Sequence, residues 1–119
     1  MRCVSNLYSF YGTSDIGFTF GDNEFPGNPW DNRDILWERS PFTYVKNIVT
    51  PLLIIHSEQD HRCPIEQGEQ MFTALKKLGR EVQFVRFPDE GHNLSRSGKP
   101  HHRVERLERV IGWFEKHLR

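Results

Sequence analysis

The 119-residue sequence lacks several features that would assign it to common protein classes. Two cysteines, Cys3 and Cys63, are too few for a disulfide framework, so we expect a reduced, cytoplasmic protein. The longest apolar run, Leu52 to Ile55, is too short to cross a bilayer, and residues 1–6 contain no apolar segment of signal-peptide type. Basic and acidic residues number 16 each, so no excess charge favours nucleic acid or a membrane surface as a partner.

The length fits one compact domain, although a hydrophobic content of 36% is somewhat low for a self-contained α/β domain. We expect residues 1–119 to form this single domain in two parts. Residues 1–51 would contain one strand and a loop-rich excursion, and residues 52–119 would form a strand–helix–strand–helix unit. This order predicts an α/β fold in three layers, with helices on both faces of a parallel sheet.

The first half is rich in turn-forming residues. An apolar segment near Cys3–Leu7 could form a strand. Glycine and proline then recur up to Pro51, which favours turns and short helices over long regular elements. Within this stretch, Asp31–Arg39 predicts a short helix whose apolar residues, Ile35, Leu36 and Trp37, are available for packing. A long irregular stretch in a small domain is usually functional.

The second half begins with a strand and a helix. Leu52–His56 is an uninterrupted apolar run, which is typical of a strand covered on both faces. Pro64 is a suitable first-turn residue for the next helix. The apolar residues of this helix recur at helical spacing, and Gly79 fits a left-handed cap at its end. They are Met71, Leu75 and Leu78, with Phe72 beside them.

A second strand and helix follow. Val82–Phe87 predicts a strand that ends before Pro88, and Pro100 predicts the start of the last helix. That helix has an apolar stripe that should pack on the sheet. The stripe comprises Val104, Leu107, Val110, Ile111, Phe114 and Leu118.

An acid and a histidine follow the two predicted strands. Asp60 comes shortly after Leu52–His56, and His92 comes shortly after Val82–Phe87. The carboxyl ends of parallel strands lie at one edge of a sheet, and adjacent strands are about 5 Å apart, so carboxylate and imidazole can meet there. The acid would fix one ring nitrogen, and the other nitrogen could take a proton from a nucleophile. Gly91 suits a tight turn before His92.

Other interpretations of these residues stay open. Glu58, Asp89 and Glu90 compete with Asp60 for the acid role, although the last two are close enough to His92 to brace its own loop instead. Asp60 could equally be a turn or capping aspartate, and His92 an exposed loop histidine.

The other histidines and Cys63 allow a metal as an alternative. His56, Glu58, Asp60, His61 and Cys63 are closely spaced, but structural zinc prefers two close Cys/His pairs, so we expect no metal and no cofactor. We interpret His101 and His102 as solvated surface residues.

Two segments resemble a known family. Residues 40–64 (SPFTYVKNIVTPLLIIHSEQDHRCP) and 84–94 (FVRFPDEGHNL) closely resemble the C-terminal part of the catalytic domain of the prolyl oligopeptidase family. The acylaminoacyl-peptidase and dipeptidyl-aminopeptidase branch is the most similar. The resemblance implies an α/β-hydrolase fold and a serine peptidase. It also implies that Asp60, in the pattern H-x-x-x-D-x-x-x-P, is the triad acid and that His92, in E-G-H, is the triad base.

The resemblance implies three further residues and a substrate. Leu7, Phe10 and Phe18 fall where relatives line an apolar specificity pocket, although packing is the more common role of such aromatics. The substrate of the full-length enzyme would be a peptide or an acyl-peptide.

The family's nucleophile serine, in its G-x-S-x-G turn, is not found in this sequence. We therefore expect a fragment with about three strands of an incomplete α/β-hydrolase sheet, whose Met1 is an internal start and which is inactive alone. The alternatives are a non-enzymatic module that forms homo-oligomers through its open sheet edge, and a piece of an esterase or lipase.

Overall fold

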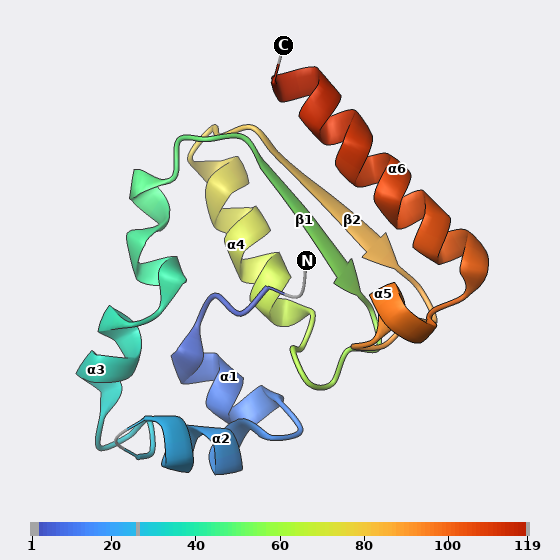
Figure 1. Cartoon of the computed structure of the whole chain (residues 1–119). Coiled ribbons are helices and arrows are strands. Elements are labelled where there is room, and N and C mark those ends of the chain that lie inside the picture. Colours follow the sequence, from blue (N-terminus) through green and yellow to red (C-terminus); the bar gives the residue numbers. More distant parts are fainter. Residues whose placement is uncertain (1–2, 26, 119) are drawn as a thin grey trace.

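The computed structural model describes residues 3–25 and 27–118. Two parallel strands form the centre, with helix α4 on one face and helix α6 on the other, and the short helices α1 to α3 lie to one side (Figure 1). This arrangement confirms the predicted three-layer α/β fold. The elements in chain order are α1 (Leu7–Thr13), α2 (Gly17–Glu24), α3 (Arg33–Glu38), the 3-10 helix η1 (Pro41–Asn47), β1 (Leu52–Ser57), α4 (Glu66–Lys77), β2 (Val82–Phe87), α5 (Leu94–Ser97) and α6 (Pro100–His117).

The two strands pair in parallel over their whole length, from Leu52 beside Val82 to Ser57 beside Phe87. Their apolar residues feed a small core on each face, as the uninterrupted run in β1 predicts. The core on the α4 side is built on Ile54, Met71, Leu75 and Val82. The core on the α6 side is built on Ile55, Phe87 and Leu94.

The strand expected near Cys3–Leu7 is wrong, and the described residues contain two strands rather than about three. The backbone N–H groups of Ser5 and Asn6 instead donate to Oε1 of Gln67 on α4, at 2.9 and 2.8 Å. The Asn6 side chain then caps α1 by accepting from the backbone N–H groups of Tyr8 and Ser9. The segment is therefore attached to a helix side chain and not to the sheet.

The apolar stripe of α6 is mostly exposed, contrary to the prediction. Val110 packs against the core on this face, but the other members are half or more exposed. The half-buried residues of the helix lie on the adjacent stripe, because a two-stranded sheet is too narrow to cover both. The exposed residues are Val104, Leu107, Ile111, Phe114 and Leu118.

Helix α4 is confirmed in outline. It begins at Glu66, two residues after the predicted first-turn Pro64, and Gly79 follows it with φ +68°, as a left-handed cap requires. Met71 and Leu75 are buried, whereas Leu78 is 39% exposed, so the predicted packing of Leu78 is wrong.

Gly68 marks the closest approach of α4 to the sheet. An added Cβ would lie 3.1 Å from both Nδ1 of His56 and the Phe84 ring. We expect Gly68→Ala to lower the free energy of unfolding by up to about 2 kcal/mol, because an overpacking cost of about 1–3 kcal/mol outweighs the helix-propensity gain of about 1 kcal/mol. Gly112→Ala on α6 is the matched control, since nothing lies within 4 Å of its added Cβ, and it should be neutral or stabilising. Urea denaturation would measure both, and equal responses would contradict the assigned close packing.

Candidate active site

Asp60 lies on the loop that leaves the carboxyl end of β1. Its side chain is almost fully buried, and Oδ1 accepts the backbone N–H groups of Arg62 at 3.1 Å and Cys63 at 2.8 Å. These bonds close a tight turn, so the turn-aspartate interpretation of Asp60 is correct as far as it goes. The turn also directs the carboxylate toward the neighbouring loop.

His92 lies on that neighbouring loop, after the carboxyl end of β2. Its Nδ1 is 3.0 Å from Oδ1 and 3.1 Å from Oδ2 of Asp60. The two loops are also joined through their backbones, since the N–H groups of Glu58 and Gln59 donate to the carbonyls of Phe87 and Glu90 at 3.0 and 2.9 Å. The structure thus brings the predicted acid and histidine together at one rim of the sheet.

The contact with Asp60 determines which ring nitrogen of His92 carries the proton. A carboxylate only accepts hydrogen bonds, so Nδ1 of His92 donates, and in the neutral ring Nε2 carries the lone pair. This is the tautomer that a general base requires. About 30% of the His92 side chain is exposed, whereas Asp60 beneath it is buried. The pair can therefore accept a proton from a group outside while its acid stays shielded from water.

The three rival acids lie elsewhere. Glu58 pairs with Arg86 at 3.0 Å and is partly exposed, and Asp89 extends toward Lys99 with 70% of its side chain exposed. Glu90 is buried but binds His102 on α6, at 2.7 Å.

Gly91 is the first residue of a tight turn that carries His92, in agreement with the prediction, since the Leu94 amide donates to the Gly91 carbonyl at 3.2 Å. Gly91 itself has no positive φ, and the left-handed residue nearby is Asp89 in the preceding turn, with φ 55°. Aspartate tolerates this conformation better than most residues, because its short polar side chain can bond locally.

The Asp60 loop is also fixed from outside, by residues that the sequence analysis did not connect to it. Arg62 forms an ion pair with Asp15 at 2.7 Å, and the hydrogen bond from Arg62 lowers the pKa of Asp15. The Asp15 amide donates to the His61 carbonyl at 2.8 Å, and the Ser14 hydroxyl donates to the Arg62 carbonyl at 2.7 Å. The loop between α1 and α2 therefore helps to hold the acid in place.

His56, near the carboxyl end of β1, also holds the Asp60 loop through a hydrogen bond. It is 1% exposed, and its Nε2 donates to the Cys63 carbonyl at 2.6 Å. Its Nδ1 is buried and has no hydrogen-bond partner within residues 3–25 and 27–118, which fits a neutral ring. Burial lowers the pKa of His56 below its usual value, and the bond to Cys63 only partly opposes this effect.

The candidate metal cluster does not assemble. Within residues 3–25 and 27–118, no three Cys, His, Asp or Glu side chains are placed to hold a metal ion together. The surface interpretation of His102 is wrong, because its side chain is only 13% exposed and is bound to Glu90. The sequence signal for this pair was weak, since the two residues lie 12 positions apart.

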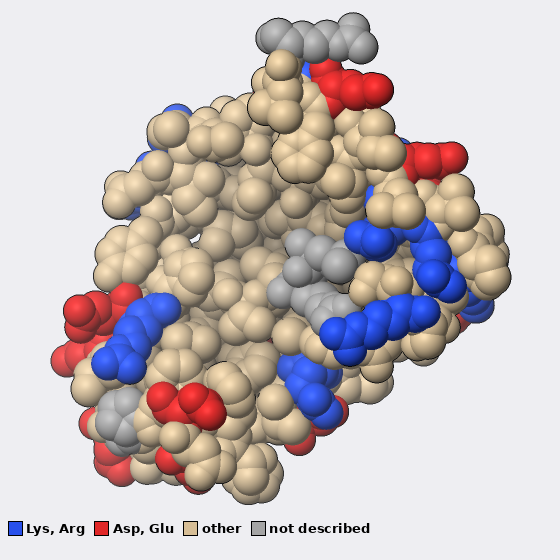
Figure 2. All heavy atoms as spheres, viewed as in Figure 1, with Lys and Arg blue, Asp and Glu red and all other residues tan. Residues whose placement is uncertain are grey.

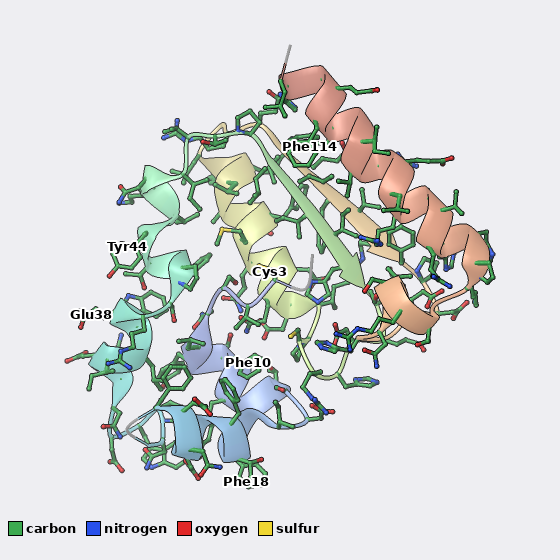
Figure 3. All side chains as sticks on the ribbon, viewed as in Figure 1. Cys3, Phe10, Phe18, Glu38, Tyr44 and Phe114 are labelled. Carbon is green, nitrogen blue, oxygen red and sulfur yellow. The ribbon has the colours of Figure 1, made fainter. Side chains whose placement is uncertain are left out.

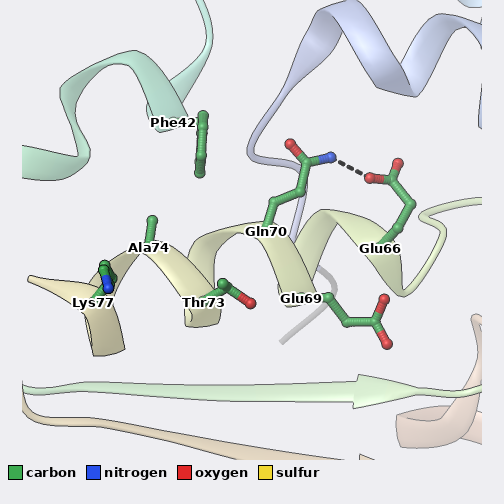
Figure 4. A pocket seen from close by; sticks show the side chains of 7 residues that line it. All are labelled: Phe42, Glu66, Glu69, Gln70, Thr73, Ala74 and Lys77. Atoms are coloured by element: carbon green, nitrogen blue, oxygen red, sulfur yellow. Dashed lines mark hydrogen bonds between the residues drawn. The ribbon is translucent and has the colours of Figure 1, made fainter.

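The three predicted pocket residues lie on α1 and α2. Phe10 is buried against the edge of Phe20, with ring centres 5.9 Å apart, whereas Phe18 is 60% exposed at the outer side of α2 (Figure 3). Leu7 is half-buried at the start of α1. A shallow groove of about 540 Å³ lies nearby, between η1 and α4, but none of the three lines it (Figure 4).

Acidic and basic side chains both occur on the face shown in Figure 2, and a broad area of that face is uncharged. Across the described residues, no helix is long and apolar enough to cross a membrane.

Comparison with known proteins identifies the family. Residues 2–119 match the prolyl oligopeptidase family. The chain belongs to this family. It is 51% identical over 117 residues to the "Uncharacterized peptidase YuxL" of Bacillus subtilis, which covers 98% of this chain and 18% of that protein.

Solved structures give the same family. An acylaminoacyl peptidase of Pyrococcus horikoshii matches with a TM-score of 0.93 and 36% identity, over 98% of this chain and 19% of that chain. An acylaminoacyl peptidase in complex with Z-Gly-Gly-Phe-chloromethyl ketone matches with a TM-score of 0.88 and 38% identity, over 96% and 18%. The chain thus has the fold of an α/β-hydrolase peptidase but spans only about a fifth of the length of these relatives.

The lowered pKa of His56 predicts acid sensitivity. Below the usual value of 6.5, the unfolded chain takes up a proton at His56 while the folded chain does not, so the free energy of unfolding falls as the pH falls. We expect His56→Gln, which retains a donor for the Cys63 carbonyl, to lose less stability than the unsubstituted protein between pH 7 and pH 5. Urea titrations at several pH values would measure this. His61→Gln, at an exposed position of the same loop, should leave the pH dependence unchanged, and an equal effect of both variants would contradict the assignment.

Proposed function

We propose that this chain supplies the acid, Asp60, and the base, His92, of a serine-type peptidase that acts on peptides or acyl-peptides. Residues 1–119 would be the C-terminal part of its catalytic domain. Asp60 orients His92, and Nε2 of His92 takes the proton of a serine hydroxyl and later gives it to the leaving amine.

One observation carries this proposal. Both carboxylate oxygens of the buried Asp60 lie within 3.1 Å of Nδ1 of His92, at the sheet edge where α/β enzymes place their catalytic groups. The relatives add support, because the matched structures include acylaminoacyl peptidases, one of them bound to a peptide chloromethyl ketone.

The nucleophile and the oxyanion donors would come from outside these residues. The sequence contains no G-x-S-x-G, the motif that gives a serine its exposed position on a sharp strand-to-helix turn. Acyl transfer needs the nucleophile, the base and the oxyanion donors together, so the 119-residue chain alone is expected to be inactive.

The proposal is tested in the complete protein that the gene encodes. Asp60→Asn should lower kcat roughly 10⁴-fold, because an amide cannot hold His92 in the required tautomer. Glu58→Gln is the matched control, since Glu58 is a partly exposed carboxylate on the same loop and pairs with Arg86. Turnover of an acyl-peptide p-nitroanilide measures both variants. Unchanged turnover in Asp60→Asn, or robust turnover by the 119-residue chain alone, would refute the proposal.

A second candidate function is supported by the exposed apolar surface of α6. Leu107 is 50% and Phe114 is 53% exposed, and Phe114 also lines a hollow with Leu52 and Leu53 of β1, whose outer edge is unpaired among the described strands. Exposed apolar surface beside an open strand edge favours association with another chain. On this proposal the 119-residue chain is a non-enzymatic module that forms a homo-oligomer.

Sedimentation of the 119-residue chain tests this second candidate. The unsubstituted chain should sediment as a concentration-dependent oligomer, and the double variant Leu107→Glu with Phe114→Glu should be a folded monomer. Glu108→Gln, on the same helix, should leave the association unchanged. A monomer at all concentrations without substitution would exclude this function.

A further inference from the structure

Glu90 is a buried acid that the proposed reaction does not use. It lies two residues before His92 and is 5% exposed. A charge in such a place needs partners, and Oε1 of Glu90 accepts from the Lys99 amide at 2.9 Å and from Nδ1 of His102 at 2.7 Å. Both partners belong to the start of α6, which follows the His92 loop and α5 in the sequence.

Glu90 also contacts the Asp60 loop through its backbone. Its carbonyl accepts from the Gln59 amide at 2.9 Å, directly beside Asp60. One residue therefore bonds to the acid loop with its main chain and to α6 with its side chain. His92 lies between these attachments and the short helix α5.

The partners of Glu90 are themselves held in place. His102 lies edge-on to the ring of Phe87, the last residue of β2, with ring centres 5.4 Å apart. Gly98 leaves space for the carboxylate, since an added Cβ would lie 2.8 Å from Oε2 of Glu90 and 2.6 Å from the Leu94 carbonyl. Leu94, which begins α5, is 4% exposed in the core.

The electrostatics agree with an ionised Glu90. Burial by itself would raise the pKa of Glu90, but the hydrogen bonds from His102 and the Lys99 amide outweigh burial, so the pKa lies below its usual value. An anion on these donors forms stronger bonds than a neutral acid would.

We propose that Glu90 is a positioning residue, whose buried carboxylate ties the His92 loop to the start of α6 and keeps His92 within hydrogen-bonding distance of Asp60. Its consequence for catalysis rests on the proposed function. Without this carboxylate, the His92 loop would lose its side-chain attachment to α6, while β1, β2, the Asp60 turn and the backbone bond from Gln59 to Glu90 stayed intact.

The test is histidine-selective ¹⁵N NMR on the complete encoded protein. The proton that Nδ1 of His92 donates to Asp60 should give a strongly deshielded resonance, assigned by its loss in His92→Gln. We expect Glu90→Ala to weaken or abolish this resonance and Glu90→Gln to restore it, because the amide oxygen can accept from the same two donors. Where the complete protein turns over substrate, kcat in Glu90→Ala should fall up to about 100-fold with KM unchanged.

Glu81 provides the matched control. It pairs with Lys116 at 2.6 Å and lies 3.5 Å from Nε2 of His117, so it also links a β2-side segment to α6, but at the opposite end of the strand. Glu81→Ala should leave the His92 resonance and kcat unchanged. Loss of the resonance in both variants would indicate general destabilisation and overturn the specific role of Glu90.

The remaining outcomes are also decisive. If Glu90→Ala does not fold, His102→Phe removes one donor while keeping a ring against Phe87, and His102→Asn retains a donor near the position of Nδ1. Loss in His102→Phe with retention in His102→Asn supports the proposal. A resonance that is unchanged in Glu90→Ala, or in His102→Phe, overturns it. A resonance missing from the unsubstituted protein would instead refute the proposed Asp60–His92 pair itself.

Discussion

The parallel pairing of β1 with β2 is the constraint on which the site depends. The two strands run in the same direction and stay in register up to Ser57 and Phe87, so both of them end at the same rim of the sheet. The two exit loops then continue the pairing through backbone hydrogen bonds to the Phe87 and Glu90 carbonyls. An antiparallel arrangement would send these loops to opposite rims and separate the acid from the histidine by the length of the strand.

Polar contacts between segments that are distant in sequence fix the positions of the Asp60 and His92 loops, which strand pairing alone does not determine. The Asp60 turn is fixed by its own amides, by His56 beneath it and by Asp15 beside it. The His92 loop is fixed through Glu90. Apart from the exposed Asp15–Arg62 ion pair, these contacts are buried or partly buried, where leaving a hydrogen bond unmade costs more free energy than forming it gains, so each one restricts the loop it holds. The apolar cores fix the strands and, through Leu94, the end of the His92 loop, but the buried residues that form them include none from the Asp60 loop.

The sequence predicted what depends on local pattern. The strands at Leu52–Ser57 and Val82–Phe87, the helix start at Pro100 and the cap at Gly79 all follow from apolar runs and turn chemistry within a few residues. It failed where a distant polar partner decides the structure. The segment after Cys3 is held by Gln67, and the half-buried His102 is bound to Glu90, and neither pairing leaves a periodic signal in the sequence.

The same division explains why Asp60 and His92 could be proposed together before their distance was known. Their placement follows from strand order, which sequence pattern reveals, and the chemistry follows from their residue types. The residues that brace the site could not be predicted in this way, because Asp15 and Arg62 are 47 positions apart in the sequence and belong to irregular loops. A site of this kind is rigid on the side of its buried acid and accessible on the side of its imidazole. That asymmetry is what a general base needs, because the proton must leave and return through the accessible side while the charge that forms on the ring is balanced from beneath.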